Sequence, residues 1–257
     1  MGSPEGEKGR WDTEGPQHEV TLSRGFWMGE TPITQHQWAA VVEAGKAKKS
    51  FWKKWFSKVE IKSAPSHFQG PGDLPVEQVN WHDSANFCQI LNALVPESPK
   101  FALPTEAKWE YACRAGTQAA FHDGSACTEP QGTDPALERL GWYGKNSGQK
   151  TQPVKGKLPN AWGLYDMHGN IWEWCADAWN RELYKSRTSV IVDPVNRGDE
   201  SASRVVRGGS WDSSARFCRA ACRDADHPGL GWGTRGLRLS TGQESAEPDV
   251  PERRSRG

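Results

Sequence analysis

Apolar residues recur at helical spacing in three segments of the first half of the chain, residues 34–44, 82–95 and 106–114. A separation of three or four residues between apolar positions is typical of a helix that buries one face. We therefore expect three helices. The apolar positions of the first two are Trp38, Val41, Val42, Ala85, Cys88, Leu91 and Leu94.

The ends of two of these helices are also marked in the sequence. Thr34 and Thr105 stand where an N-cap hydroxyl is expected, because threonine accepts a hydrogen bond from a free backbone N–H of the first turn. Gly45 and Gly116 stand where the first and third helices would end.

The strand signals are shorter and lie mostly at the two ends of the chain. Residues 18–28 predict a pair of strands with a turn, and residues 204–210 predict a strand that leads into loops rich in Gly and Asp. Residues 235–239 predict a short closing strand. Residues 117–158 are Gly-, Pro- and polar-rich, with one short ordered piece near 140–143.

The chain contains no internal repeat and no Pro/Gly/Ser-rich linker between two apolar segments. These observations predict one domain over residues 1–240. Residues 241–257 are charged and contain proline, which predicts a disordered tail.

Composition excludes several classes of protein. The 257 residues have a formal net charge of zero, which gives no electrostatic basis for binding nucleic acid. No window approaches the 18 apolar residues of a membrane span, and the start lacks the apolar segment of a signal peptide. The chain as given is therefore expected in the cytoplasm, with surface display by a partner left open. The six cysteines lack CxxC spacing and are expected to be reduced thiols.

Lysines alternate with aromatic residues over residues 46–63. One interpretation is a patch that binds nucleic acid or phosphate. The other is a surface insertion whose aromatics pack inward while the lysines stay solvated. The zero net charge favours the second interpretation.

Three long motifs occur in a fixed order: LPTEAKWEYACRAGT, then NAWGLYDMHGNIWEWCADAW, then RVVRGGSW…CRAACR…RGLRL. With them the chain resembles the formylglycine-generating-enzyme (sulfatase-modifying factor) family from about Met1 to Leu239. The resemblance implies a C-type-lectin-like α+β fold that is loop-rich, with small twisted sheets and two or three helices. Family members usually have a further strand before the Met-Gly-Ser with which this chain opens.

The oxidases of this family bind copper through two cysteines that follow the Gly-Gly-Ser motif. The resemblance places these positions at Ser213 and Cys218. A hydroxyl is a poor ligand for Cu(I), so neither copper nor catalysis is expected. The alternative function is a copper-dependent oxidase that acts through Cys218. The other interpretation of Cys218 is a small hydrophobic side chain buried in the core. Related sulfoxide synthases take iron from a His-rich second domain, and the seven scattered histidines of this chain do not fit them.

A third group of relatives comprises the variable proteins of diversity-generating retroelements, in which a C-terminal stretch is rewritten at adenines in the gene. Residues 204–240 contain no Lys, Glu, Gln or Met, the residue types that mutated AAC codons do not yield. Chance in a segment rich in Gly, Arg and Ala is the other explanation. A mutated AAC codon does not yield tryptophan, so Trp232 does not fit this pattern. Leu237 stands in place of the usual Phe of the closing motif.

This likeness predicts a non-enzymatic protein that binds a protein or carbohydrate ligand through an exposed surface over residues 211–234. Buried arginines between the loops would hold the base of this surface. An inert accessory domain is a further alternative. The candidate binding residues are Trp211, Asp212, Ser213, Ser214, Phe217, Asp224, Ala225, Asp226, His227, Leu230, Trp232, Gly233 and Thr234.

The second motif offers two carboxylates and several turn carbonyls within a few residues, and all-oxygen sets suit Ca²⁺. The resemblance implies a structural calcium here, with Asp166 and Glu173 as side-chain ligands and Gly169 and Ile171 as carbonyl ligands. The alternative is an aspartate that caps a turn and a glutamate paired with a core arginine.

Overall fold

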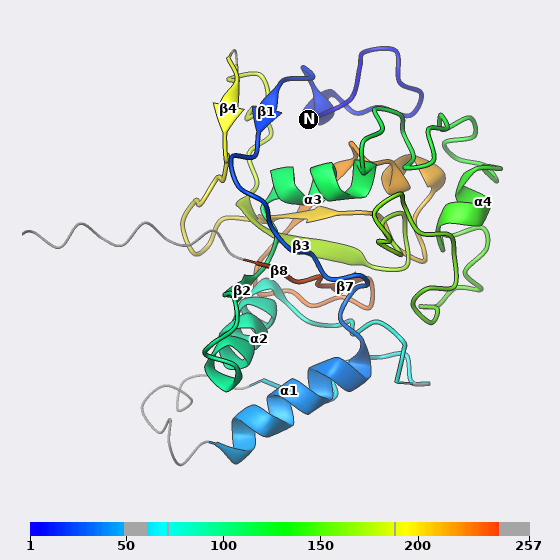
Figure 1. The fold of residues 1–257 in the computed structure, drawn as a ribbon. Helices are drawn as coiled ribbons and strands as arrows, with labels where there is room; N and C mark the ends of the chain where they lie inside the picture. Colours follow the sequence, from blue (N-terminus) through cyan, green and yellow to red (C-terminus); the bar gives the residue numbers. More distant parts are fainter. Residues whose placement is uncertain (49–60, 71, 188, 242–257) are drawn as a thin grey trace, which may run out of the picture.

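A four-stranded sheet forms the centre of the computed structural model, which describes residues 1–257 except 49–60, 71, 188 and 242–257 (Figure 1). Its strand order is β6-β5-β3-β7, in which only the β3–β7 pair is parallel. The strands are β3 (Trp172–Ala178), β5 (Arg204–Arg207), β6 (Arg223–Asp226) and β7 (Arg235–Gly236). The motif residues 204–236 thus supply three of the four strands.

Two small sheets flank the central one. The strands β1 (Val20–Thr21) and β4 (Ile191–Val192) pair in parallel, and β2 (Phe101–Ala102) pairs antiparallel with β8 (Ser240–Thr241). The strand pair predicted over residues 18–28 is wrong, because β1 pairs with a strand far along the chain. A turn signal cannot reveal such a long-range partner.

Three helices cover the central sheet from both sides (Figure 1): α1 (Gln35–Ala47), α2 (Trp81–Leu94) and α3 (Glu106–Arg114). Thr34 and Thr105 cap α1 and α3 as predicted. The predicted stop at Gly45 is wrong, since α1 continues to Ala47 with Gly45 buried inside it.

The shorter elements lie outside these layers. They are the single-turn helix α4 (Leu137–Leu140) and the 3-10 turns η1 (Asp12–Glu14) and η3 (Ala215–Cys218). The predicted long irregular stretch over residues 117–158 contains only α4 within the described structure.

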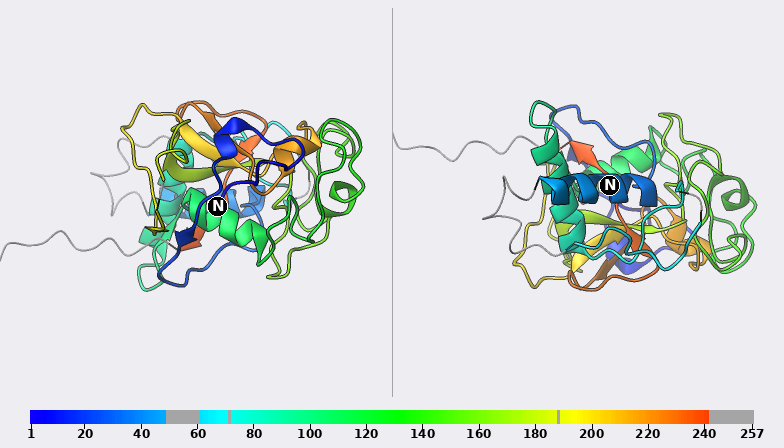
Figure 2. Two further views of the ribbon diagram at one scale, coloured as in Figure 1. Left: turned by 90° about the horizontal axis from the view of Figure 1, so that it is seen from above. Right: turned by 90° about the horizontal axis from the view of Figure 1, so that it is seen from below.

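The two faces of the sheet bury different residues because side chains alternate along a strand. Val206 and Trp174 pack on the side of α1 and α2, where the Trp38 and Phe87 rings stack with centroids 4.9 Å apart. The two helices cross each other below the sheet (Figure 2). On the other face, Val205 packs against α3. The α+β, loop-rich fold with few helices and small sheets is therefore confirmed.

All six cysteines lie within the described structure, and all are free and buried, as predicted for reduced thiols. Among the described helices, none combines the length and the apolar character needed to cross a bilayer. Most of the basic-aromatic stretch at 46–63 and nearly all of the predicted tail at 241–257 lie outside the described residues.

Candidate functional site

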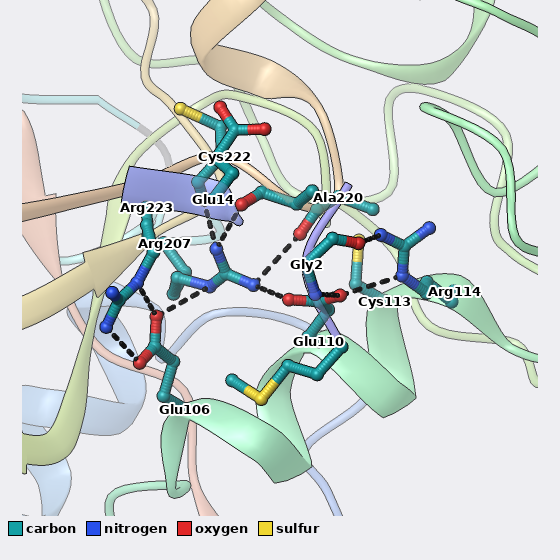
Figure 3. Close-up of polar contacts among 12 residues, drawn as sticks. Gly2, Glu14, Glu106, Glu110, Cys113, Arg114, Arg207, Ala220, Cys222 and Arg223 are labelled. Carbon is teal, nitrogen blue, oxygen red and sulfur yellow. Dashed lines mark hydrogen bonds and ion pairs between the residues drawn. The ribbon is translucent and has the colours of Figure 1, made fainter. Parts of the chain in front are cut away.

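Arginine side chains form the floor beneath the loops of residues 208–234. Arg207 on β5 lies between Glu106 and Glu110 of α3 (Figure 3). It also donates to the carbonyl oxygens of Ala220, Ala221 and Cys222, so one guanidinium ties a helix to the segment that follows η3. Such a planar donor fork suits this position because it satisfies several acceptors at fixed angles.

Three further arginines with fully buried side chains extend this floor, and together with Arg207 we call them the arginine base. Each is paired with glutamate from a distant part of the chain. The pairs are Arg219 with Glu7 and Glu14, Arg223 with Glu106, and Arg238 with Glu173. Residues far apart in sequence are thereby fixed under the loops.

The charges of the arginine base are balanced locally. Burial alone would raise the pKa of Glu110, but the ion pairs with Arg114 and Arg207 lower that pKa to about 2. Arg223 holds both oxygens of Glu106 at 2.7 Å. The arginines also lower the pKa of Glu106, so the ion pairs outweigh burial at both carboxylates of α3.

A tight turn carries the first predicted binding residues from β5 to the surface. Gly208 and Gly209 have φ values of 101° and 77°, and a Cβ on Gly209 would lie 2.5 Å from the Cys218 Sγ. The Ser213 hydroxyl lies 2.9 Å from the Ser210 hydroxyl and accepts from the Ser210 N–H. The prediction that Ser213 is exposed is wrong, because Ser213 closes this turn and is buried.

The β6–β7 loop (residues 227–234) carries the most exposed of the candidate residues. Leu230 and Trp232 are 43% and 52% exposed, and His227 is also exposed. Its backbone is held by hydrogen bonds to residues outside the loop. The Gln78 N–H donates to the Trp232 carbonyl, and the Trp81 N–H donates to the Pro228 carbonyl. The Trp172 N–H donates to the Thr234 carbonyl, and the Trp211 indole donates to the Gly233 carbonyl.

The remaining candidates take intermediate positions. Asp212 is exposed, while Trp211 and Phe217 are half-buried. The ring centroids of Trp211 and Phe68 are 5.3 Å apart, and those of Phe217 and Trp172 are 6.2 Å apart. Both contacts help to hold the loops. The other half-buried candidates are Ser214, Asp224, Ala225, Asp226, Gly233 and Thr234.

Sequence reasoning missed residues 66–70 and 72–83, several of which contact the β6–β7 loop. Glu77 is fully buried there. Its Oε1 accepts the Phe68 N–H at 2.9 Å, and its Oε2 has no hydrogen-bond partner among the described residues. Burial raises the pKa of Glu77 to about 7. The only sequence signal was a glutamate between Val76 and Val79, in a stretch that otherwise resembles a buried strand.

The residues predicted to bind calcium are already engaged with one another and with the core. Glu173 accepts from the Trp109 indole at 2.7 Å and from the Arg238 guanidinium through both oxygens. The Gly169 carbonyl accepts the Ile171 N–H at 2.9 Å. Asp166 accepts the Lys155 N–H, with burial raising its pKa. This set does not fit Ca²⁺, because Glu173 could bind the ion only by leaving Arg238 unpaired.

We expect the melting temperature to be the same in excess EDTA and in millimolar CaCl₂, because Arg238 already neutralises Glu173. Differential scanning fluorimetry measures this directly, with MgCl₂ as the control salt. A rise in melting temperature specific to calcium and lost in Asp166→Asn would contradict the expectation.

The positions of the two copper cysteines do not provide two thiolates. Ser213 is tied to Ser210, and burial raises the pKa of the Cys218 thiol well above its usual range. His168 lies behind Cys218, and its Nδ1 donates to the Cys218 carbonyl at 2.6 Å. Burial also lowers the pKa of His168 well below its usual range. The donor set therefore does not fit a copper site with two soft sulfur ligands.

Comparisons with known proteins agree on the fold. Residues 1–241 match the model of the Sulfatase-modifying factor enzyme 1-like domain. A formylglycine-generating enzyme of Streptomyces coelicolor is 30% identical, over 93% of this chain and 85% of that protein. A serine/threonine-protein kinase pkn1 of Chlamydia pneumoniae is 28% identical over 93% of this chain, which spans 36% of that protein.

Two solved structures resemble the chain over most of its length. Treponema denticola variable protein 1 is 30% identical with a TM-score of 0.69, covering 90% of this chain and 88% of its own. PvdO from Pseudomonas aeruginosa is 25% identical with a TM-score of 0.73, covering 95% of this chain and 90% of its own.

Proposed function

The chain belongs to the family of Sulfatase-modifying factor enzyme 1-like domains, and from this premise we propose that it is a non-enzymatic ligand-binding protein of the variable type. Its receptor surface comprises the exposed and half-buried residues of 211–234, without Ser213. The ligand is a protein or a carbohydrate. The likeness to Treponema denticola variable protein 1 supports this assignment within the family.

The observation that carries the proposal is how the β6–β7 loop is held. Three backbone carbonyls of the loop accept hydrogen bonds from backbone N–H groups elsewhere in the fold. Leu230 and Trp232, by contrast, project from the loop and are largely exposed. Side chains on such a loop can be exchanged at little cost in stability, as on the loops of a paratope.

The arginine base also supports the proposal, because it lies beneath the receptor surface. Its ion pairs involve residues that are not candidates for variation, and they fix both ends of the receptor surface. A surface on a rigid support loses little conformational entropy when it binds. Variation above this support therefore alters recognition without altering the fold.

The first test is to sequence the codons for residues 204–240 across a population of the source organism. Substitutions concentrated at 212–217, 224–227 and 230–234, with the Gly-Gly-Ser-Trp motif and residues 218–223 unchanged, are the expected result. Identical codons throughout would count against a diversified surface.

The rival function is that of a copper-dependent oxidase acting through Cys218, and the 30% identity to a formylglycine-generating enzyme supports it. A Cu(I) titration separates the two functions. We expect no stoichiometric binding of Cu(I), because the Cys218 thiol is buried and the other copper-ligand position holds Ser213. Tight binding that is lost in Cys218→Ala would establish the rival.

Two glycines of the β6–β7 loop offer a matched stability test. A Cβ on Gly233 would meet no atom closer than 3.6 Å, whereas a Cβ on Gly231 would lie 2.7 Å from the Gln78 carbonyl oxygen. Gly233→Ala is therefore expected to change the free energy of unfolding by less than about 0.5 kcal/mol. Gly231→Ala is expected to lower it by about 1 kcal/mol.

Urea denaturation of both variants checks this pair. An equal decrease in the free energy of unfolding of the two variants would mean that Gly233 tolerates a side chain no better than Gly231 does, and that Gly233 is unsuited to variation.

A further inference from the structure

A polar cleft opens beside the β6–β7 loop, at the start of α2. It encloses about 340 Å³, within the range of small-molecule sites. Most of its wall lies outside the stretch proposed to vary, and only one loop residue contributes. The lining residues are Trp38, Lys62, Pro65, Gln78, Asn80, Asp83 and Gly231.

Several polar groups of this wall are left over after the local hydrogen bonds are made. The Asn80 Oδ1 accepts the Asp83 N–H at 2.8 Å, and the Asp83 Oδ2 accepts the Asn80 N–H at 3.2 Å. The Asn80 Nδ2, the Asp83 Oδ1 and the side-chain amide of Gln78 make no hydrogen bond to any described residue. The cleft therefore presents both donors and acceptors.

Gln78 holds an unusual backbone conformation at the edge of the cleft. Its φ is 59°, in the left-handed region that favours glycine, and its side chain is exposed. Glutamine there costs more than glycine would, and strained residues of this kind cluster at binding sites. The conformation directs the Gln78 N–H to the Trp232 carbonyl, so the cleft and the loop are joined at this residue.

We propose that this cleft binds a neutral saccharide and acts as a fixed subsite beside the variable loop. The charges of Lys62 and Asp83 cancel, so the wall does not select an ionic ligand. The side-chain amide of Gln78 offers a donor and an acceptor, the Asn80 Nδ2 offers donors and the Asp83 Oδ1 an acceptor, which matches hydroxyl groups that do both. The lining also includes Trp38, whose indole N–H is already bonded to the Lys62 carbonyl, so this part of the wall is fixed.

This inference rests on the proposed function, because the loop and the cleft would engage one ligand together. A neutral peptide also carries donors and acceptors, but none of the described lining residues belongs to a strand that a peptide backbone could extend. The hydroxyl-rich ligand is therefore favoured.

The test is saturation-transfer NMR with methyl α-mannoside, methyl β-galactoside and methyl N-acetyl-β-glucosaminide, with a capped triglycine as the comparison probe. The wild-type chain is expected to bind at least one glycoside. Gln78→Gly is expected to weaken that binding at least tenfold without a lower melting temperature, because glycine adopts the same φ freely. Gln149→Gly is the matched control, since Gln149 has the same φ of 59° and does not line the cleft.

The inference is overturned if no glycoside binds, if only the peptide binds, or if both glutamine variants behave alike. These outcomes leave the proposed function to be decided by the codon survey. Conversely, saccharide binding that depends on Gln78 in a chain with uniform codons would retain the cleft and reject the variable surface.

Discussion

Replacing Arg207 by methionine is expected to lower the free energy of unfolding by about 3–5 kcal/mol. The methionine fills much of the space but provides no donor. The carbonyl oxygens of Ala220, Ala221 and Cys222 lose their shared partner, and Glu110 keeps only Arg114. The cost arises because buried carbonyl oxygens lose their donor and the buried Glu110 carboxylate keeps one arginine in place of two.

Chemical denaturation of the wild type, Arg207→Met and Arg181→Met measures this effect. Arg181 is 70% exposed and lies 3.9 Å from Glu182, so its replacement is expected to cost less than about 0.5 kcal/mol. Arg207→Lys keeps the charge but loses the planar fork, and we expect it to recover only part of the loss. A cost for Arg207→Met as small as that of the surface control would mean that the arginine base does not hold the fold.

Glu77→Gln is expected to make the protein more stable above neutral pH, by about 1–2 kcal/mol after allowance for solvent screening. Burial raises the pKa of Glu77 to about 7, above its usual value of 4.5. Below the usual value the carboxyl is protonated in both states, and the wild type bears no charge penalty. As the pH rises through 7, the folded protein loses stability because a charge forms in the buried site.

The difference between wild type and Glu77→Gln should therefore be small near pH 5 and reach its full size near pH 8. Urea denaturation at both pH values measures it, with Glu97→Gln as the control because Glu97 is exposed. A difference in unfolding free energy that does not change with pH would show that burial does not raise the pKa of the Glu77 carboxyl.

Features set by neighbouring residues could be predicted from the sequence. The caps at Thr34 and Thr105 depend on hydrogen bonds within three residues, so a local pattern reveals them. The end of α1 was misplaced because Gly45 is buried against the core, and packing there outweighs the low helix propensity of glycine.

Features set by distant residues could not be predicted from one sequence. The burial of Ser213 depends on how the Gly208-Gly209 turn folds back over Cys218. The place of Glu77 beside Gly233 joins segments that have no sequence relation. The motifs pointed to the stretch 211–234 that we propose as the receptor surface, whereas the neighbouring cleft is visible only in the folded arrangement.

The order of the ion-pair partners along the chain has a consequence for biosynthesis. The carboxylates Glu14, Glu106 and Glu173 leave the ribosome before the arginines that neutralise them, which lie between residues 207 and 238. Until residues 207–238 are made, these three carboxylates lack the arginines that neutralise them in the fold. The central sheet also awaits β5, β6 and β7. Folding of this domain is thus completed only after residue 238 has been translated, and a ribosome stalled before that residue would hold a chain that proteases readily cut.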